Sequence, residues 1–148
     1  MNVGLTVNGA EVELDTRPDE MLLAALHREL GLLSVRDTCS LGICGACTVL
    51  LDGEPVSACL LLAPLAAGCA VETVEGLGGD HPVQRAFAEV RAYQCGWCTP
   101  GMILTAKALL DDTPHPTDEE IVSALSGNLC RCGSHVKILE AVRRAVAT

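Results

Sequence analysis

Hydrophobic and polar residues alternate with a period of two in the first part of the chain. Residues 3–7 and 10–14 both alternate in this way, and an Asn-Gly pair lies between them, which predicts a β-hairpin. The period then becomes helical over residues 20–30, with Asp19 as the expected N-terminal cap and Gly31 as the stop. A hairpin followed by an amphipathic helix indicates a mixed α and β domain.

The strand pattern resumes in the middle of the chain. Residues 48–51 and 56–59 are predicted to form a second hairpin across an Asp-Gly turn. A short helical turn over residues 60–65, ended near Pro64, and a strand over residues 70–74 are expected to follow. Together these elements predict a small sheet covered by one helix.

After the glycine-rich segment 76–80 the period is helical throughout. Four helices are predicted: one with Pro82 in its first turn after Asp80 or His81, one from Thr99, one capped by Thr117 with Glu120 and ending at Gly127, and one capped by Ser134 over residues 135–147. We therefore expect an α+β fold of two domains, residues 1–76 and residues 77–148.

The loop between the first predicted helix and the second hairpin contains a cysteine motif. Cys39, Cys44, Cys47 and Cys59 have the spacing C-x4-C-x2-C-x11-C, which is typical of plant-type [2Fe-2S] sites. Two glycines in this loop permit positive φ angles and close approach of the backbone to sulfur. A structural zinc site is the alternative, but such sites usually have two short cysteine pairs and not one wide loop.

A second group of four cysteines lies at the junctions between predicted helices. Cys95 and Cys98 precede the second of these helices, and Cys130 and Cys132 precede the fourth. Short connections at one end of a helical bundle bring such residues together, so one ligand set is predicted, for which zinc and a cluster fit the spacing equally. The ninth cysteine, Cys69, has no ligand spacing and is expected to be a buried small hydrophobic residue.

Composition and charge narrow the classes of partner. The formal net charge of −9 argues against nucleic acids and anionic membrane surfaces, and the 49% hydrophobic content is that of an ordered globular protein. No signal peptide and no membrane-spanning run is expected. Nine cysteines in such a chain are typical of metal ligands in a cytoplasmic protein, where thiols stay reduced.

The order of the cysteine motifs resembles a known family. CSLGICGAC with Cys59, then QCGWCTPGM, then GNLCRC, is similar to the small iron-sulfur subunits of the xanthine oxidase family of molybdenum hydroxylases, over essentially the whole chain. The resemblance implies a ferredoxin-like β-grasp domain with one [2Fe-2S] cluster, followed by a four-helix domain with the second. By position it assigns Cys39, Cys44, Cys47 and Cys59 to the first cluster and Cys95, Cys98, Cys130 and Cys132 to the second.

The same resemblance implies partner subunits. Gln94 and the Cys132 region would lie beside the pterin of a molybdenum cofactor on a large subunit, and the first cluster would face a medium, FAD-binding subunit, in a heterotrimer or a dimer of heterotrimers. Electrons would pass from molybdenum through the helical-domain cluster and the N-terminal cluster to FAD. Thr38, where a glycine often stands, and Gly133-Ser-His135, where Thr-Gly-Tyr is usual, depart from the family pattern.

The leading hypothesis is an electron-transfer subunit of a heteromeric oxidoreductase that hydroxylates a small organic molecule, either a carbonyl compound or a heterocycle, or oxidises carbon monoxide. The chain has no activated nucleophile, acid–base pair or phosphate-binding loop, so the substrate chemistry would take place on another subunit. A free two-cluster ferredoxin and a zinc-stabilised interaction module are the alternatives.

Overall fold

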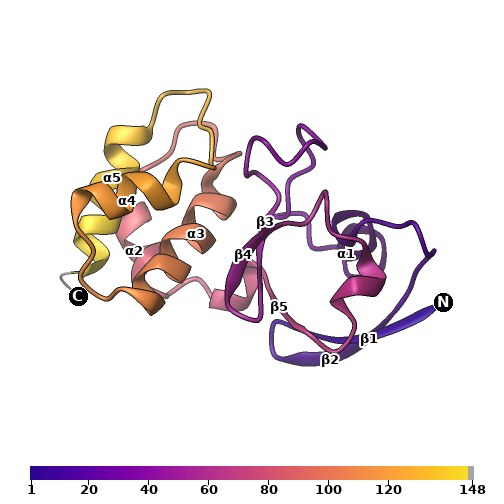
Figure 1. Cartoon of the computed structure of the whole chain (residues 1–148). Helices are drawn as coiled ribbons and strands as arrows, with labels where there is room; N and C mark the ends of the chain where they lie inside the picture. The colour runs from indigo at the N-terminus through magenta and orange to yellow at the C-terminus, as the bar shows by residue number, and fades with distance from the viewer. Residues whose placement is uncertain (147–148) are drawn as a thin grey trace.

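A computed structural model describes residues 1–146, with one sheet formed by the first half of the chain and mostly helices in the second half (Figure 1). The sheet has the strand order β2-β1-β5-β3-β4, in which β1 and β5 are parallel and the other neighbours are antiparallel. The strands are β1 (Asn2–Val7), β2 (Ala10–Asp15), β3 (Thr48–Leu51), β4 (Glu54–Ser57) and β5 (Ala70–Glu72).

Both predicted hairpins are confirmed. Each turn has positive φ at both central positions, 50° at Asn8 and 82° at Gly9, then 51° at Asp52 and 91° at Gly53, as a two-residue turn between twisted strands requires. The end of the second hairpin differs from the prediction, because pairing with β3 stops at Ser57. The chain turns there through a bond from the Leu60 amide to the Ser57 carbonyl, so Cys59 lies in the turn and not in the strand.

The first helix, α1 (Leu22–Leu30), begins two residues later than predicted, and the expected capping role of Asp19 is wrong. Met21 occupies the N-cap without a side-chain hydrogen bond, while the Asp19 carboxylate accepts a hydrogen bond from Arg17 at 3.2 Å. The stop is confirmed, because Gly31 is left-handed with φ of 65° and its amide bonds to the carbonyl of His27.

The segment between β4 and the second half contains two short 3-10 helices, η1 (Ala63–Ala66) and η2 (Val74–Leu77). Pro64 lies in the first turn of η1 and does not end it, since a helix needs no amide donor at that position. The predicted strand 70–74 is confirmed only as far as Glu72, because η2 begins at Val74.

The second half contains α2 (Pro82–Glu89), α3 (Thr99–Asp112), α4 (Asp118–Leu125) and α5 (His135–Val146). His81 caps α2, and the predicted capping box of Thr117 with Glu120 is confirmed at α4. α4 ends at Leu125, two residues before the expected stop at Gly127. Ala147, the expected last residue of α5, lies outside the described residues. None of the helices within residues 1–146 combines the length and apolar character needed to cross a bilayer.

The buried residues form two hydrophobic cores that meet at β3. One core lies between the sheet and α1 and includes Leu14, Leu22, Leu26, Val49 and Val71, and the other lies among α2 to α5 and includes Phe87, Met102, Leu104, Ile121 and Ile138. Side chains of a strand alternate between its two faces, so Val49 enters the first core and Leu50 enters the second. The two halves of the chain therefore share a packed boundary along β3 and α3.

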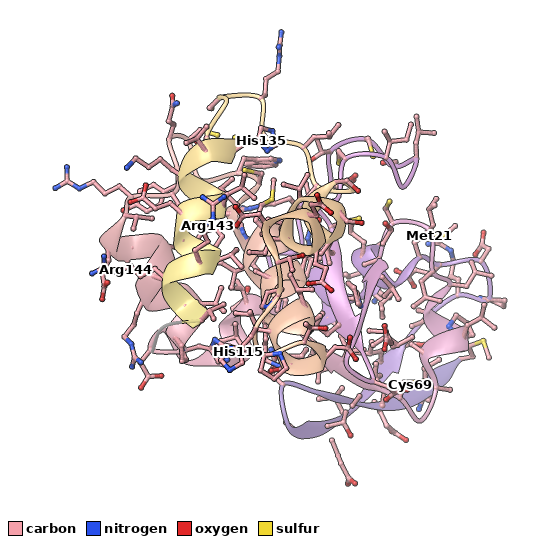
Figure 2. The ribbon with its side chains drawn as sticks, turned by 60° about the vertical axis from the view of Figure 1, so that its left-hand side comes forward. Met21, Cys69, His115, His135, Arg143 and Arg144 are labelled. Carbon is pink, nitrogen blue, oxygen red and sulfur yellow. The ribbon has the colours of Figure 1, made fainter. Side chains whose placement is uncertain are left out.

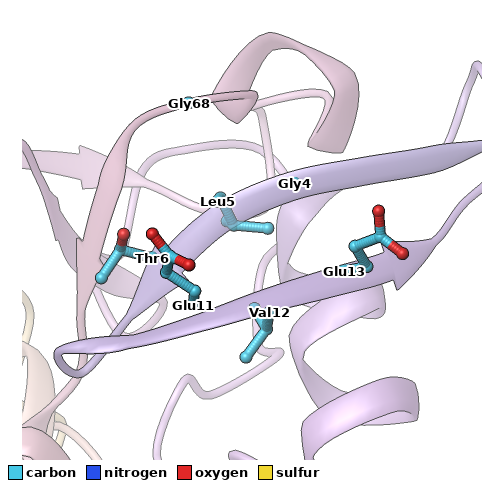
Figure 3. Close-up of a pocket in the computed structure, with 7 residues that line it drawn as sticks. All are labelled: Gly4, Leu5, Thr6, Glu11, Val12, Glu13 and Gly68. Atoms are coloured by element: carbon cyan, nitrogen blue, oxygen red, sulfur yellow. The ribbon is translucent and has the colours of Figure 1, made fainter.

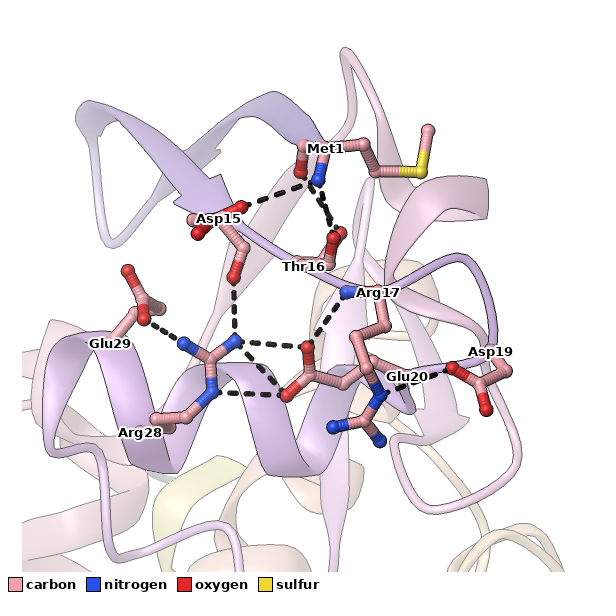
Figure 4. Close-up of polar contacts among 8 residues, drawn as sticks. All are labelled: Met1, Asp15, Thr16, Arg17, Asp19, Glu20, Arg28 and Glu29. Atoms are coloured by element: carbon pink, nitrogen blue, oxygen red, sulfur yellow. Dashed lines mark hydrogen bonds and ion pairs between the residues drawn. The ribbon is translucent and has the colours of Figure 1, made fainter.

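A buried carboxylate fastens α1 to the end of the first hairpin (Figure 4). Glu20 is 5% exposed and accepts hydrogen bonds from Arg28 Nη2 at 2.9 Å and from the Arg17 amide at 3.1 Å. Arg28 also donates to the Asp15 carbonyl at 2.6 Å. The hydrogen bond from Arg28 holds the pKa of Glu20 below its ordinary value, although burial opposes this.

We expect Glu20→Gln to destabilise the chain at neutral pH and to matter less in acid. A carboxyl whose pKa is lowered by folding contributes stability above its unfolded pKa, about 4.3, and that contribution is lost as the pH falls through the folded value. Thermal unfolding of the full chain at pH 7 and at lower pH would measure the difference between the two proteins. Glu11→Gln, at an exposed position of β2, is the control, and a pH-independent effect at Glu20 would contradict the prediction.

Candidate metal centres

The loop 31–47 between α1 and β3 presents three of the four cysteines of the first predicted set. Gly42 and Gly45 both have φ of 69°, as expected, and Ser40 at 51° is a third left-handed residue that the sequence did not indicate. A Cβ at Gly42 would lie 2.3 Å from Leu60 Cδ1, and one at Gly45 would lie 2.5 Å from the Gly127 carbonyl oxygen. Both glycines are required by their positive φ, and Gly45 is required by space as well, because a backbone oxygen cannot move aside as the exposed Leu60 side chain can.

The four thiols of the first set come together as two pairs. The side chain of Cys39 contacts that of Cys44, and the side chain of Cys47 contacts that of Cys59. Hydrogen bonds from the backbone amides of Leu41, Cys44 and Ile43 lower the pKa of Cys39 to about 6, whereas burial raises that of Cys47 to about 11. Amides directed at sulfur favour a thiolate, the form that ligates metal.

The second set of four thiols is also arranged as two pairs. Cys95 contacts Cys132, and Cys98 contacts Cys130, across the α2–α3 and α4–α5 connections. A hydrogen bond from the Trp97 amide lowers the pKa of Cys95, and burial raises that of Cys98 to about 12. Burial opposes ionisation of Cys130 too, but the Ser134 amide donates to its sulfur at 3.4 Å and its pKa lies below the ordinary value.

Paired thiols fit a binuclear cluster better than a single zinc ion. Each iron of a [2Fe-2S] cluster takes two protein ligands, so two pairs of thiols match two irons, whereas zinc requires four ligands around one point. Both sets of cysteines thus fit [2Fe-2S] clusters.

A buried asparagine that the sequence analysis did not single out joins the two halves beside both sets. Asn128 Nδ2 donates to the Gly45 carbonyl at 3.0 Å, and Asn128 Oδ1 accepts from Thr105 Oγ1 at 3.0 Å. The next residue, Leu129, donates its amide to the Cys44 carbonyl at 2.9 Å. The residue before Cys130 is therefore hydrogen-bonded to a cysteine of the first set.

Gln94 and Cys132 lie together, because the Gln94 amide group donates to the Cys132 carbonyl at 2.9 Å. The departures at positions 133–135 leave this region ordered: Gly133 has φ of 79°, Ser134 is buried, and His135 is the exposed first residue of α5 (Figure 2). At the other departure, Thr38 does not adopt positive φ, so the loop does not need a glycine there.

The ninth cysteine lies apart from both sets, and its expected burial is wrong. Cys69 is only partly buried and lies in the turn before β5, far from His135 at the second set (Figure 2). Gly68, with φ of 76°, turns the chain just before β5, and the hydrogen bond between the Cys69 side chain and Asp52 raises the pKa of the Cys69 thiol.

A groove of about 400 Å³ lies on the first hairpin (Figure 3). Its lining residues are Gly4, Leu5, Thr6, Glu11, Val12, Glu13 and Gly68. The lining contains two carboxylates and one hydroxyl but no cysteine, histidine or lysine. The groove therefore offers no activated nucleophile, in agreement with a chain whose chemistry is that of its cysteines.

Comparison with known proteins assigns each half of the chain to a family of iron-sulfur domains. Residues 5–68 match the family described as 2Fe-2S iron-sulfur cluster binding domain, and residues 73–143 match the [2Fe-2S] binding domain family. The chain is 52% identical to a nicotinate dehydrogenase subunit of Pseudomonas putida and 50% identical to the nicotinate dehydrogenase small FeS subunit of Eubacterium barkeri, each over 99% of this chain and 95% of the relative.

A solved structure is similar to the chain over nearly its whole length. Quinoline 2-oxidoreductase from Pseudomonas putida 86 superposes with a TM-score of 0.94 at 41% identity, covering 99% of this chain and 93% of the other. The chain belongs to the iron-sulfur subunits of the xanthine oxidase family. This iron-sulfur subunit has two [2Fe-2S]-binding domains and serves electron transfer in a molybdenum-containing oxidoreductase.

Proposed function

We propose that the iron-sulfur subunit carries electrons from a molybdenum cofactor on a large subunit, through two [2Fe-2S] clusters, to FAD on a medium subunit. The observation that carries the proposal is the arrangement of eight thiols as two sets of two pairs, one set in each half. Each cluster, when bound, supplies one-electron redox chemistry. Cys39, Cys44, Cys47 and Cys59 would hold one cluster, and Cys95, Cys98, Cys130 and Cys132 the other.

Two domains with different folds would divide the two clusters between them. Residues 1–76 would form a ferredoxin-like β-grasp domain, in which α1 covers the five-stranded sheet, and residues 77–148 would form a four-helix domain. The two hydrophobic cores and the family matches at residues 5–68 and 73–143 support this division.

The two sets would face different partner subunits. The hydrogen bond between Gln94 and the Cys132 carbonyl puts a polar, exposed group beside the second set, suited to contact the pterin of a molybdenum cofactor. Leu41, Ile43 and Leu60, between 56% and 66% exposed, form an apolar surface around the first set, as a subunit interface requires. We propose that the FAD-binding subunit covers this surface, in a heterotrimer or a dimer of heterotrimers.

The names of the relatives suggest a substrate class for the assembled enzyme. Two of them are subunits of nicotinate dehydrogenases, and the solved structure is that of a quinoline 2-oxidoreductase. Both names denote nitrogen-containing aromatic rings. We propose that the enzyme oxidises such a ring on its large subunit, and nicotinate is the first compound to assay.

The purified subunit is expected to contain about four irons and four acid-labile sulfides per chain, because two complete sets of four thiols are present. Cys47→Ser and Cys98→Ser should each leave about two irons, since each removes one thiolate from a different set. Elemental analysis and sulfide assay measure both quantities. Cys69→Ser should keep all four irons, and zinc in place of two irons would contradict the assignment of one set.

A further inference from the structure

The two cluster loops touch at a second place, on the outer edge of the molecule. Trp97, in the α2–α3 connection between Cys95 and Cys98, donates its indole Nε1–H to Thr38 Oγ1 at 2.8 Å. Thr38 immediately precedes Cys39, the first cysteine of the N-terminal set. This single hydrogen bond therefore joins a residue beside one set of thiols to a residue beside the other.

The Arg36 side chain, from the first half of the chain, contacts the face of the Trp97 indole. The Arg36 guanidinium carbon lies 4.7 Å from the centroid of the Trp97 ring, within the range of a cation–π contact. The Arg36 amide donates to the Ala46 carbonyl at 3.1 Å, which anchors this residue across the base of the loop. Trp97 is thus held by two residues of the loop, through the face of its ring and through its N–H.

The start of the first cluster loop has little else to hold it. Among the described residues, the side-chain hydrogen bonds of residues 37–41 stay within the loop 31–47, as from Ser40 to Asp37 and from the Leu41 amide to Cys39 Sγ, except for the bond from Trp97. Cys44, at the other end of the loop, is fastened to Leu129. The bond from Trp97 to Thr38 thus attaches the Cys39 end of the loop to the second half of the chain, as the bond from Leu129 attaches Cys44.

The bonds from Trp97 to Thr38 and from Leu129 to Cys44 lie next to particular thiol pairs. Thr38 and the Cys44 carbonyl flank the Cys39–Cys44 pair, while Trp97 and Leu129 immediately precede Cys98 and Cys130, which form a pair of the second set. The residues bonded across the loops therefore adjoin one pair of each set. We propose that Trp97 is a positioning residue for electron exchange between the two clusters, holding the Cys39–Cys44 pair against the Cys98–Cys130 pair through Thr38 and Arg36.

This inference rests on the proposed function. Measuring the iron content shows whether a negative result contradicts the proposed function or only the role of Trp97. Fewer than four irons in the unaltered subunit would contradict the proposed function. With four irons present, the test is the magnetic interaction between the two clusters in the dithionite-reduced enzyme, measured as spin–spin splitting by electron paramagnetic resonance. That splitting depends on the distance and orientation of the clusters and not on turnover.

Trp97→Phe and Thr38→Val should each weaken the splitting, because each removes one partner of the hydrogen bond; valine keeps the shape of threonine, and phenylalanine keeps an aromatic ring beside Arg36. Loss of a hydrogen bond of ordinary net strength changes the equilibrium between molecules with and without the contact of the two loops by roughly fivefold. The fraction of molecules in which the loops are in contact should therefore fall by up to that factor. The double variant should be no worse than either single one. Thr38→Ser keeps the hydroxyl and should restore the splitting of the unaltered enzyme.

Tyr93→Phe is the matched control, because it removes one hydroxyl from another exposed aromatic ring of the same connection and should leave the splitting unchanged. As Trp97 is the single tryptophan of the chain, its fluorescence also reports directly on the contact in Thr38→Val. If Thr38→Val loses iron while Thr38→Ser does not, the hydroxyl already positions Cys39 during cluster assembly, as inferred. Unchanged splitting in iron-replete Trp97→Phe would overturn the proposal.

Discussion

Cys130→Ser should leave the assembled enzyme able to take electrons from substrate but unable to pass them to flavin at a useful rate. Cys130 belongs to the set beside Gln94, which we propose to lie next to the molybdenum cofactor. Losing one thiolate of four removes a ligand and the folding energy coupled to it, so this set should lose its two irons. In a single turnover, flavin reduction should fall to a small fraction of its normal rate.

The matching change in the other set should block a later step. Cys44→Ser should keep the helical-domain set reducible by substrate and stop electrons only after it. Stopped-flow absorbance at cluster and flavin wavelengths distinguishes the two variants, and Cys69→Ser, outside both sets, is the control. Normal flavin reduction in Cys130→Ser would show that the proposed order of carriers is wrong.

Gly101→Ala should destabilise the chain strongly, although it adds only one methyl group. A Cβ at Gly101, in the first turn of α3, would lie 2.3 Å from the Gly45 carbonyl oxygen and 3.2 Å from Asn128 Nδ2. Alanine favours the helix by about 1 kcal/mol. Overpacking costs about 1–3 kcal/mol, and each buried polar group left without its partner costs about 1–3 kcal/mol more, so net destabilisation of about 3 kcal/mol is expected.

The chain offers a matched control for this change. A Cβ at Gly127 would meet no atom within 4 Å, and Gly127 adjoins the same asparagine. Gly127→Ala should therefore be nearly neutral. Chemical unfolding and iron retention would compare the two variants, and equal stability would mean that the contact of Gly101 with Gly45 does not hold the halves together.

Hairpins and caps were predictable because their signals are local. An Asn-Gly or Asp-Gly pair demands positive φ at both residues, and such a turn sets the register of the strands on either side. The capping box of Thr117 and Glu120 likewise satisfies backbone donors within one turn. These elements agree with the sequence to within a residue or two.

The predicted ends of a helix and a strand were wrong where contacts with residues distant in sequence overrode the local preference of the chain. Asp19 is a good capping residue, but Glu20 is drawn into the bond with Arg28, and the Leu22 amide at the helix start donates to the Leu61 carbonyl at 2.7 Å. The helix therefore begins later. At Cys59 a strand pattern continued, but the pairing of β4 with β3 ends at Ser57 and the Leu60 amide turns back to the Ser57 carbonyl.

By itself, the sequence determined which eight cysteines form two sets and which glycines the first loop needs, because ligand spacing and positive φ are properties of neighbouring residues. The tertiary structure alone decided how the thiols pair and how the sets face each other. Asn128 reaches Gly45 across 83 positions, and Trp97 reaches Thr38 across 59. No periodicity or spacing records such contacts, since they depend on α3 packing against β3 and on nothing local to either residue.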